Sequence, residues 1–415
     1  MINTTDVTRK LCSIEDAPHV TEFTPYRVCP VGAHTDHQLG KVTGFAIDRG
    51  VRLVCVPTED GSIELSSLQF PSTARFTLNN VPPTPVGDWA DYLRGATLAL
   101  AARHSLRVGM RGVIEGELPI GGLSSSAAVT ISYLNALCRL NEVALSADEM
   151  VKTARASENN YVGVSCGKLD QSCEVYCVAD HLLYMDMLDD SFENIPAPPT
   201  MKPYKIAVFF SGIERTLVGS GYNTRVDECR SAAYALKAYA GTEYGKFAET
   251  NLRDVPYEVY QSYKSRLPET WARRAEHWYG EMARVERGAE AWRRGDIEEF
   301  GRISFESGRS SIELWETGSQ ELVKLYEIMT HVDGIYGGRF SGAGFKGCCV
   351  ALIDPSFEKN IIRQVTSEYL SEFPQLSGSF SIHLCTTHNG SGLRPRTGIG
   401  SAEPTGMNRR TFSLG

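Results

Sequence analysis

The sequence predicts a two-domain protein that mixes strands and helices. A chain of 415 residues is longer than one hydrophobic core usually organises. Strand-like apolar runs and amphipathic helical patterns follow one another in both halves of the chain. Between the halves, the segment 192–203 carries four prolines and is the best candidate for a linker. We therefore predict an N-terminal lobe over 1–195 and a C-terminal lobe over 204–388.

The elements of each lobe follow from local patterns. In the first half, strands are predicted at 42–56, 63–70 and 111–117, and helices at 88–104, 125–141 and 146–162. The last of these helices opens on the N-cap residue Ser146, which early acidic residues follow. In the second half, we predict a strand at 204–211, a mostly helical region at 224–329, a glycine-rich turn and strand at 334–354, and a helix at 356–371. The tail 389–415 lacks periodicity and is predicted to be disordered.

The composition argues against several classes of protein. A net charge of −8 and a pI near 5.7 disfavour general binding to nucleic acids or anionic membranes. The chain has no apolar run of about 18 residues and no basic-then-apolar leader at its N-terminus. Its 11 cysteines have irregular spacings, which is typical of reduced and mostly buried thiols. We expect a cytoplasmic protein, with a monomer favoured and no nucleic-acid or membrane partner.

A glycine and serine segment at 116–128 has the features of a triphosphate cradle. A strand ends there, Gly121 and Gly122 turn the chain, and a serine cluster opens a helix. Glycine lets backbone N–H groups approach an anion, and a helix N-terminus carries partial positive charge. The segment is not a Walker motif, because no Gly-Lys-Ser/Thr follows. A serine-capped helix after a tight turn is the plain structural alternative.

Three further segments carry candidate chemistry. The segment 334–353 has six glycines within fourteen residues, which is typical of a loop held against a ligand or another backbone, or of a plain hairpin. The segment 25–37 crowds polar side chains that suit the hydroxyls of a polyol, although a polar surface loop would look the same. Glu158 and Asp170 lie twelve residues apart and could hold a metal and accept a proton, or be ordinary solvated carboxylates.

In this order, the segments resemble the galactokinase branch of the superfamily of galacto-, homoserine, mevalonate and phosphomevalonate kinases. The resemblance covers about residues 20–355 and includes the signature Arg27-Val-Cys-Pro-Val-Gly-Ala-His-Thr-Asp36. It implies the family's sugar-kinase fold, two α+β lobes with the active site between them. It also implies that the substrates are ATP and a sugar, and that Mg²⁺ is the cofactor.

Site residues follow from the resemblance position by position. Asp170 matches the catalytic aspartate, and Arg27 matches the arginine beside it. Glu158 matches a magnesium ligand, and Ser126 matches the other one better than Ser125 does. The nucleotide-binding positions are Trp89, Tyr92, Gly121, Gly122, Ser124, Ser125 and Ser126. The sugar-contacting positions are His34, Asp36, Gly167 and Tyr222.

Three departures from galactokinases concern the sugar and the nucleotide turn. Ala33 replaces the glutamate that takes the C6 hydroxyl, His37 replaces the usual tyrosine, and the turn after Pro119 is one residue shorter. Ala33 and the stretches around Tyr222 and at 340–349 are similar to plant galacturonokinases, which implies phosphorylation of the C1 hydroxyl of D-galacturonate. Tyr222, His37, Arg215 or a backbone N–H could bind the C6 carboxylate, and the sequence does not choose among them.

Other functions stay open at this point. The same fold could phosphorylate galactose, arabinose or another sugar altered at C6. A non-catalytic sugar sensor is disfavoured because Arg27, Ser126, Glu158 and Asp170 are all present. A mevalonate-type kinase is disfavoured by the sugar-binding His34-Thr-Asp36 run.

Overall fold

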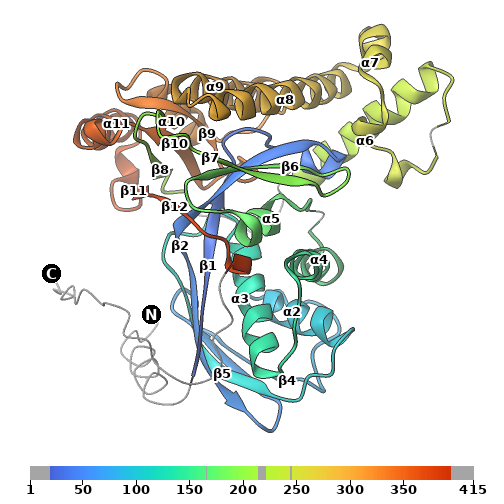
Figure 1. Cartoon of the computed structure of the whole chain (residues 1–415), viewed down its shortest axis with the longest axis vertical. Helices are drawn as coiled ribbons and strands as arrows, with labels where there is room; N and C mark the ends of the chain where they lie inside the picture. The colour runs from blue at the N-terminus through green and yellow to red at the C-terminus, as the bar shows by residue number, and fades with distance from the viewer. Residues whose placement is uncertain (1–18, 165, 214–220, 244, 394–415) are drawn as a thin grey trace.

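The computed structural model describes residues 19–164, 166–213, 221–243 and 245–393. Figure 1 shows an elongated molecule built around two sheets. One part holds long strands backed by α2 (Asp91–Ala101), α3 (Ser125–Leu140) and α4 (Ala147–Ser157). The other part holds a smaller sheet beneath a group of longer helices. This mixture of helices and strands confirms the predicted α+β fold, whereas the domain boundaries remain a prediction.

The larger sheet is organised by one long central strand. β2 (Lys41–Thr58) has 18 residues, and most of its side chains are buried. The sheet order is β4-β3-β5-β2-β6-β7, and two further strands, β1 and β12, also pair with β2. The other bounds are β1 (Val20–Val28), β3 (Ser62–Ser67), β4 (Thr73–Thr77), β5 (Gly109–Gly116), β6 (His181–Asp186), β7 (Phe192–Pro196) and β12 (Thr387–His388). The pairing of β1 with β2 fixes the position of the Arg27 segment at the end of β1.

The helices against this sheet form because their apolar faces complete its core. α3 packs on β1 and β2 through fully buried residues such as Ile131 and Leu134. α4 begins at Ser146, whose side chain and that of Glu149 form a reciprocal capping box. It continues into a π-helical turn, η2 (Glu158–Val162), and α5 (Leu169–Tyr176) follows shortly after. The predicted N-cap is therefore confirmed.

The smaller sheet has the order β11-β8-β10-β9 and lies beneath the remaining helices. Its strands are β8 (Lys205–Phe210), β9 (Ile335–Phe340), β10 (Cys348–Ile353) and β11 (Ser381–Cys385). The helices are α6 (Tyr222–Tyr239), α7 (Tyr257–Tyr263), α8 (Glu269–Arg293), α9 (Ile297–Glu313), α10 (Gln320–Met329) and α11 (Glu358–Glu372). One hydrophobic core contains residues of both sheets, including Phe45 of β2 and Leu352 of β10.

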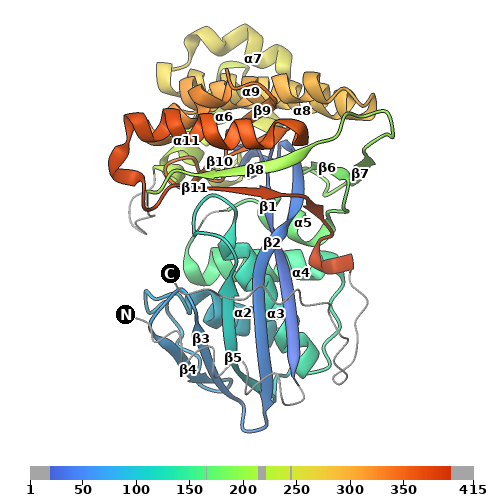
Figure 2. The same cartoon turned by 90° about the vertical axis from the view of Figure 1, so that its left-hand side faces the viewer.

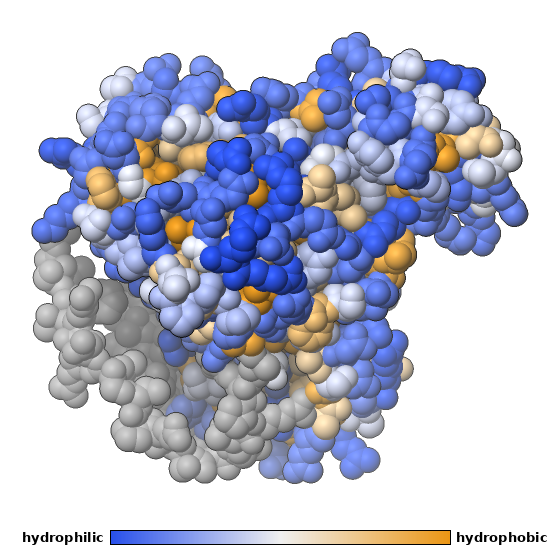
Figure 3. Space-filling model, turned by 45° about the horizontal axis from the view of Figure 1, so that its top comes forward, coloured by the Kyte–Doolittle hydropathy of each residue, from blue (hydrophilic) through white to orange (hydrophobic). Residues whose placement is uncertain are grey.

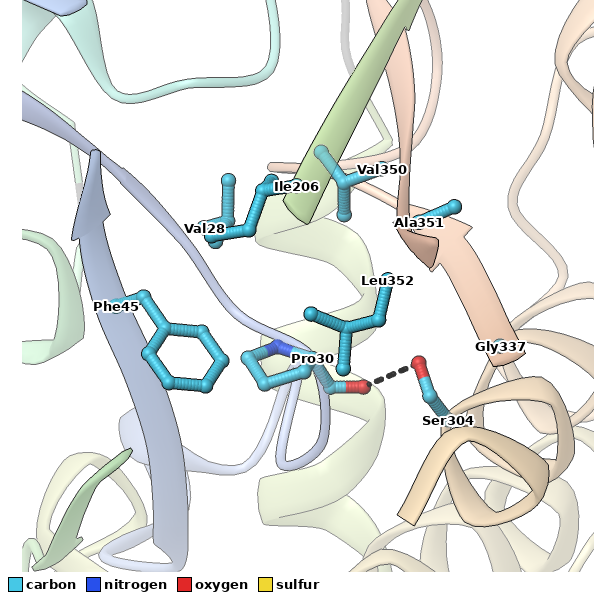
Figure 4. Close-up of a pocket in the computed structure, with 9 residues that line it drawn as sticks. All are labelled: Val28, Pro30, Phe45, Ile206, Ser304, Gly337, Val350, Ala351 and Leu352. Atoms are coloured by element: carbon cyan, nitrogen blue, oxygen red, sulfur yellow. Dashed lines mark hydrogen bonds between the residues drawn. The ribbon is translucent and has the colours of Figure 1, made fainter. Parts of the chain in front are cut away.

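The small cavity where the two sheets meet is part of this core. It has a volume of about 10 Å³ and is lined by apolar side chains from both sheets, with the Ser304 hydroxyl bonded to the Pro30 carbonyl (Figure 4). A volume near 10 Å³ holds at most one water molecule. The cavity is therefore a packing feature and not a substrate site.

Two surface properties agree with the composition. Among the described helices, none is both long and apolar enough to cross a membrane. The face shown in Figure 3 is mostly hydrophilic, and its hydrophobic residues are scattered. The ten cysteines within the described residues are all free, and nine of them are buried.

Two predicted boundaries differ from the structure. Residues 192–196 of the predicted linker form β7, which pairs with β6 at the edge of the sheet, where Pro196 is tolerated. The predicted disordered tail begins too early, because residues 389–393 make defined contacts. Residues 394–415 lie outside the described residues, so the prediction for them is not tested.

The end of the described chain forms a strap over α5. It returns from β11 through β12 to the larger sheet (Figure 2). The Gly390 N–H donates to the Cys177 carbonyl at 2.7 Å, and the Ser391 hydroxyl donates to the Glu174 carbonyl at 3.1 Å. The Asn389 side chain accepts from the Ala179 N–H at 2.8 Å. The strap thus satisfies carbonyl groups at the C-terminal end of α5, the helix that carries Asp170.

Truncation after His388 is expected to destabilise the protein, although a disordered tail, as predicted from the sequence, would be dispensable. Three hydrogen bonds are lost, each contributing about 1 kcal/mol. We expect a fall of several degrees in Tm and a lower turnover number. Truncation after Leu393 retains all three bonds and serves as the control. Equal Tm values for the two truncations would show that the strap is not structural.

Candidate active site

Arg27 and Asp170 form the centre of the site. Arg27 is the last residue but one of β1, and Asp170 lies in the first turn of α5. The Arg27 Nε donates to the Asp170 Oδ1 at 2.7 Å, and Arg27 is almost fully buried while Asp170 remains partly accessible. The Arg27 Nη1 also donates to the Gly122 carbonyl at 2.9 Å. One guanidinium therefore joins the predicted catalytic carboxylate to the predicted phosphate-binding turn.

The two glycine segments pack against each other, backbone to backbone. Gly122 has a φ of +85°, and a Cβ atom there would lie 2.8 Å from the Cys348 Sγ and 2.9 Å from the Ser341 carbonyl oxygen. Gly121 has a φ of +148° and meets the Cα of Gly347 in the same way, at 2.9 Å. The Ser341 hydroxyl donates to the Gly122 carbonyl at 2.6 Å. Glycine is required here by both conformation and space.

The serine cluster lies at the start of α3, which begins at Ser125. Ser124 is the N-cap residue in the left-handed conformation, and its buried hydroxyl has no hydrogen-bond partner among the described residues. Ser125 and Ser126 are partly exposed. The first N–H groups of a helix lack intrahelical partners and attract anions. This end of α3 can therefore receive phosphate oxygens.

Glu158 lies at the junction of α4 and η2 and is buried. Its Oε2 accepts from the Gln171 Nε2 at 2.6 Å, whereas its Oε1 has no partner among the described residues. Burial, together with the charge of Asp170, raises the pKa of Glu158 to about 7, against the lowering influence of the nearby Cys166, Ser126 and Gln171 side chains. The predicted metal ligands are thus neighbours.

This pair of oxygen ligands fits Mg²⁺ bound together with phosphates. Mg²⁺ prefers oxygen ligands and usually takes one or two from the protein, with the rest from water and substrate phosphates. The described residues contain no group of three or more His, Cys, Asp or Glu side chains that could hold a metal ion alone. The unpaired Glu158 Oε1 is the atom available to such an ion.

Asp36 and Gly167 are brought together beside Asp170. A Cβ atom on Gly167 would lie 2.0 Å from the Asp36 Oδ2, so no side chain fits there. The Leu169 N–H donates to the same oxygen at 3.4 Å. Burial, with a contribution from the charge of Asp170, raises the pKa of Asp36 to about 6. The predicted sugar-contacting positions therefore line one side of the Asp170 carboxylate.

His34, His37 and Tyr222 form a group of rings near Asp36 and Asp170, together with Trp315, which no sequence motif marks. The His34 ring stacks on Trp315 with centroids 4.9 Å apart and an angle of 6° between the planes. The centroid of the His37 ring lies 5.4 Å from that of the Trp315 ring and 5.9 Å from that of the Tyr222 ring. Arg215, another residue that could bind the C6 carboxylate, lies outside the described residues.

α8 fixes the backbone of the loop that carries Ala33 and His34. The Gly32 N–H donates to the Glu281 Oε1 at 2.7 Å, and the His277 Nε2 lies 3.2 Å from the Ala33 carbonyl oxygen. Glu281 is fully buried and also accepts from the Arg284 Nε at 2.6 Å. His277 ends the stretch Arg273-Arg-Ala-Glu-His277, which is similar to plant galacturonokinases, whereas no sequence motif marks Glu281.

Glu281→Gln is expected to lower the free energy of unfolding by about 2 kcal/mol at neutral pH. Burial raises the pKa of Glu281, but Arg284, His277 and Arg339 outweigh burial and bring this pKa down to about 2. Because the folded pKa is depressed, the carboxylate stabilises the protein above its unfolded pKa of about 4.5, and this stabilisation is lost as the pH falls towards 2. Thermal unfolding should show a Tm difference from wild type that is constant above about pH 5 and narrows below it. A difference independent of pH would contradict the assignment.

Trp89 and Tyr92, which the family resemblance predicts to flank the adenine, lie at the start of α2. Trp89 and Tyr92 are partly buried against the main core, and the Trp89 Nε1 donates to the Ser72 hydroxyl at 2.9 Å. Phe70, not identified from the sequence, lies parallel to Trp89 with centroids 6.1 Å apart. The contact of these aromatic rings with adenine remains a prediction.

The fold and these segments define a GHMP kinase. Residues 91–177 match the GHMP kinases N terminal domain, and residues 289–371 match the GHMP kinases C terminal domain. The chain is 38% identical to the galacturonokinase of Arabidopsis thaliana over 385 residues, which cover 87% of this chain and 90% of that protein. The chain therefore belongs to the GHMP kinase family, within its sugar kinases, as its motifs predicted.

Other members of the family support this placement. The galactokinase of Roseiflexus sp. (strain RS-1) is 32% identical over 378 residues, covering 90% of this chain and 93% of that protein. The crystal structure of Lactococcus lactis galactokinase complexed with galactose superposes with a TM-score of 0.83 at 25% identity, covering 93% and 98% of the two chains. The Methanococcus jannaschii mevalonate kinase shares the fold, with a TM-score of 0.64 at 18% identity and coverage of 89% and 99%.

Proposed function

We propose that this protein transfers the γ-phosphoryl group of ATP to the C1 hydroxyl of D-galacturonate, giving galacturonate 1-phosphate. The observation that carries this proposal is the double contact of Arg27 with Asp170 and with the Gly122 carbonyl. This contact supports the proposal because one guanidinium links the predicted catalytic carboxylate to the predicted phosphate turn. The 38% identity to a galacturonokinase supports the choice of sugar.

In this proposal Asp170 accepts the proton of the C1 hydroxyl as that oxygen attacks the γ-phosphorus. Arg27 orients the Asp170 carboxylate through its hydrogen bond and stabilises the charge of the transferring group. The glycine turn and the start of α3 position the phosphates, and Asp36 with Gly167 orients the sugar. Mg²⁺, when bound, would neutralise phosphate charge, and Ser126 and Glu158 would hold it.

The proposal is tested by measuring ATP consumption with galacturonate, glucuronate, galactose and arabinose. We expect kcat/KM to be highest for galacturonate, by at least about tenfold over galactose. A preference for galactose or arabinose would select one of the alternative sugar kinases. Sugar binding without any ATP consumption would indicate a sensor.

Glu158→Ala and Ser126→Ala are each expected to raise the Mg²⁺ concentration needed for half-maximal rate by about tenfold or more. Each variant loses one of the two protein oxygens proposed to reach the ion. Magnesium titrations of turnover at saturating ATP measure this effect. Ser125→Ala is the comparison, because Ser125 is the less favoured ligand, and a larger shift in that variant would reassign the site.

We also propose that the enzyme works as a cytoplasmic monomer. The cysteines within the described residues are free thiols, which fits the reducing environment of the cytoplasm. ATP is the proposed phosphoryl donor. Size-exclusion chromatography with light scattering would test the monomer.

A further inference from the structure

Four buried nitrogen atoms near the proposed sugar site have no hydrogen-bond partner among the described residues. They are the Nε2 of His34, both ring nitrogens of His37, and the Nε1 of Trp315. More than about 90% of buried polar groups in proteins have a partner. Several unpaired N–H groups gathered at one place therefore point to a ligand that accepts hydrogen bonds.

These atoms belong to one compact group of rings, which we call the donor box: His34, His37, Tyr222 and Trp315. His34 stacks on Trp315, and His37 contacts both Trp315 and Tyr222. The four residues come from the loop before β2, the first residue of α6, and the chain just after α9. Three distant segments thus converge on one place, as in a built binding site.

Two arginines, Arg225 and Arg230, lie near the donor box. Arg225 donates its Nε to the Trp315 carbonyl at 2.7 Å and its Nη2 to the Glu316 carbonyl at 2.6 Å. Burial, with charges that include Arg225 for His34 and Arg230 for His37, lowers the pKa of both imidazoles. Each neutral imidazole keeps one N–H donor. The box therefore offers hydrogen-bond donors near two arginines and has no acidic side chain of its own, while the carboxylates of Asp36 and Asp170 lie near Tyr222.

We propose that the donor box binds the C6 carboxylate of the sugar acid, with the Trp315 and His37 N–H groups as the discriminating donors. This inference rests on the proposed function and assigns the group that the sequence left open. A carboxylate has about four lone-pair sites and can satisfy several N–H groups together. A C6 hydroxyl accepts fewer and would leave buried donors unpaired, which is the situation in which sites reject an analogue.

The neighbouring Ala33 fits the same assignment. It is buried, and its small side chain brings no charge to the loop that carries His34. The loop is held in place from behind by His277 and Glu281. Alanine at position 33 thus removes a repulsive group, and the donor box adds an attractive one.

The test compares Trp315→Phe and His37→Phe with the wild type. Trp315→Phe removes one N–H and keeps an aromatic ring against His34. Trp292→Phe is the matched control, because its Nε1 donates to the Ile195 carbonyl at 3.0 Å within the core. We expect the ratio of kcat/KM for galacturonate to that for galactose to fall by about tenfold or more in each box variant and to stay unchanged in the control.

A second readout is the rise in Tm that galacturonate causes without ATP. It should shrink in both box variants and persist in Trp292→Phe. His37 is a partly exposed loop residue. If Trp315→Phe fails to fold, His37→Phe therefore still tests whether the donor box binds the C6 carboxylate. A wild type that prefers galacturonate, with an unchanged ratio in the variants, would overturn this inference alone. A wild type that prefers galactose would overturn the proposed function, and this inference with it.

Discussion

Asp170→Asn is expected to lower kcat by at least about 100-fold while galacturonate still binds. In the wild type, the Arg27 Nε donates to the Asp170 Oδ1 at 2.7 Å. An asparagine side chain retains an oxygen that can accept this hydrogen bond, so the geometry around Arg27 can persist. It cannot take up the proton that leaves the C1 hydroxyl. The loss should therefore appear in kcat and not in the affinity for the sugar.

The control for this experiment is Asp190→Asn. Asp190 forms an ion pair with Lys168, which precedes Asp170 by two residues, and within the described part of the chain Asp190 forms no ion pair with Arg27. Turnover is measured with saturating ATP and galacturonate, and binding by the ligand-induced change in Tm. Near-normal turnover of Asp170→Asn would remove this residue from the role of general base.

Elements that bury one continuous face were predictable from sequence. The predicted strand at 42–56 lies within β2, and the predicted helix at 125–141 matches α3. β1 was missed because Pro25 interrupts its pattern, and the structure has an irregular register between Pro25 and Arg27. α5 was missed because its 8 residues are too few to establish helical periodicity.

Some residues of the candidate site were also predictable from the sequence, whereas others were not. Short linear motifs contain Arg27, Asp36, the glycine turn, Glu158 and Asp170. The types and spacing of these residues could therefore be recognised in the sequence. Trp315 and Glu281 act through position alone, because α8 and α9 bring them to the loop around His34. A buried glutamate or tryptophan in a helical region has no sequence pattern that separates a site residue from a core residue. Contacts between distant segments were therefore the missing information.

The charge at position 33 can be separated from its size with two variants. Ala33 is buried, and its carbonyl is held by His277 on α8, so any longer side chain costs packing energy. Ala33→Gln brings this steric cost without a charge. Ala33→Glu brings the same length and a carboxylate, so the difference between the two variants reports the charge.

We expect Ala33→Glu to lose about a thousandfold more galacturonate activity than Ala33→Gln does. At about 4 Å and an effective dielectric constant of about 20, two carboxylates repel each other by roughly 4 kcal/mol, which corresponds to this factor in binding. Galactose carries a neutral hydroxyl at C6, which can donate to the introduced carboxylate, so its kcat/KM should differ little between the two variants or favour Ala33→Glu. Steady-state kinetics with both sugars and both variants measures the effect, and Tm values show whether each variant is folded. Equal losses of galacturonate activity in Ala33→Gln and Ala33→Glu would mean that position 33 does not face the C6 carboxylate. The absence of a negative charge at position 33 would then no longer explain a preference for the sugar acid.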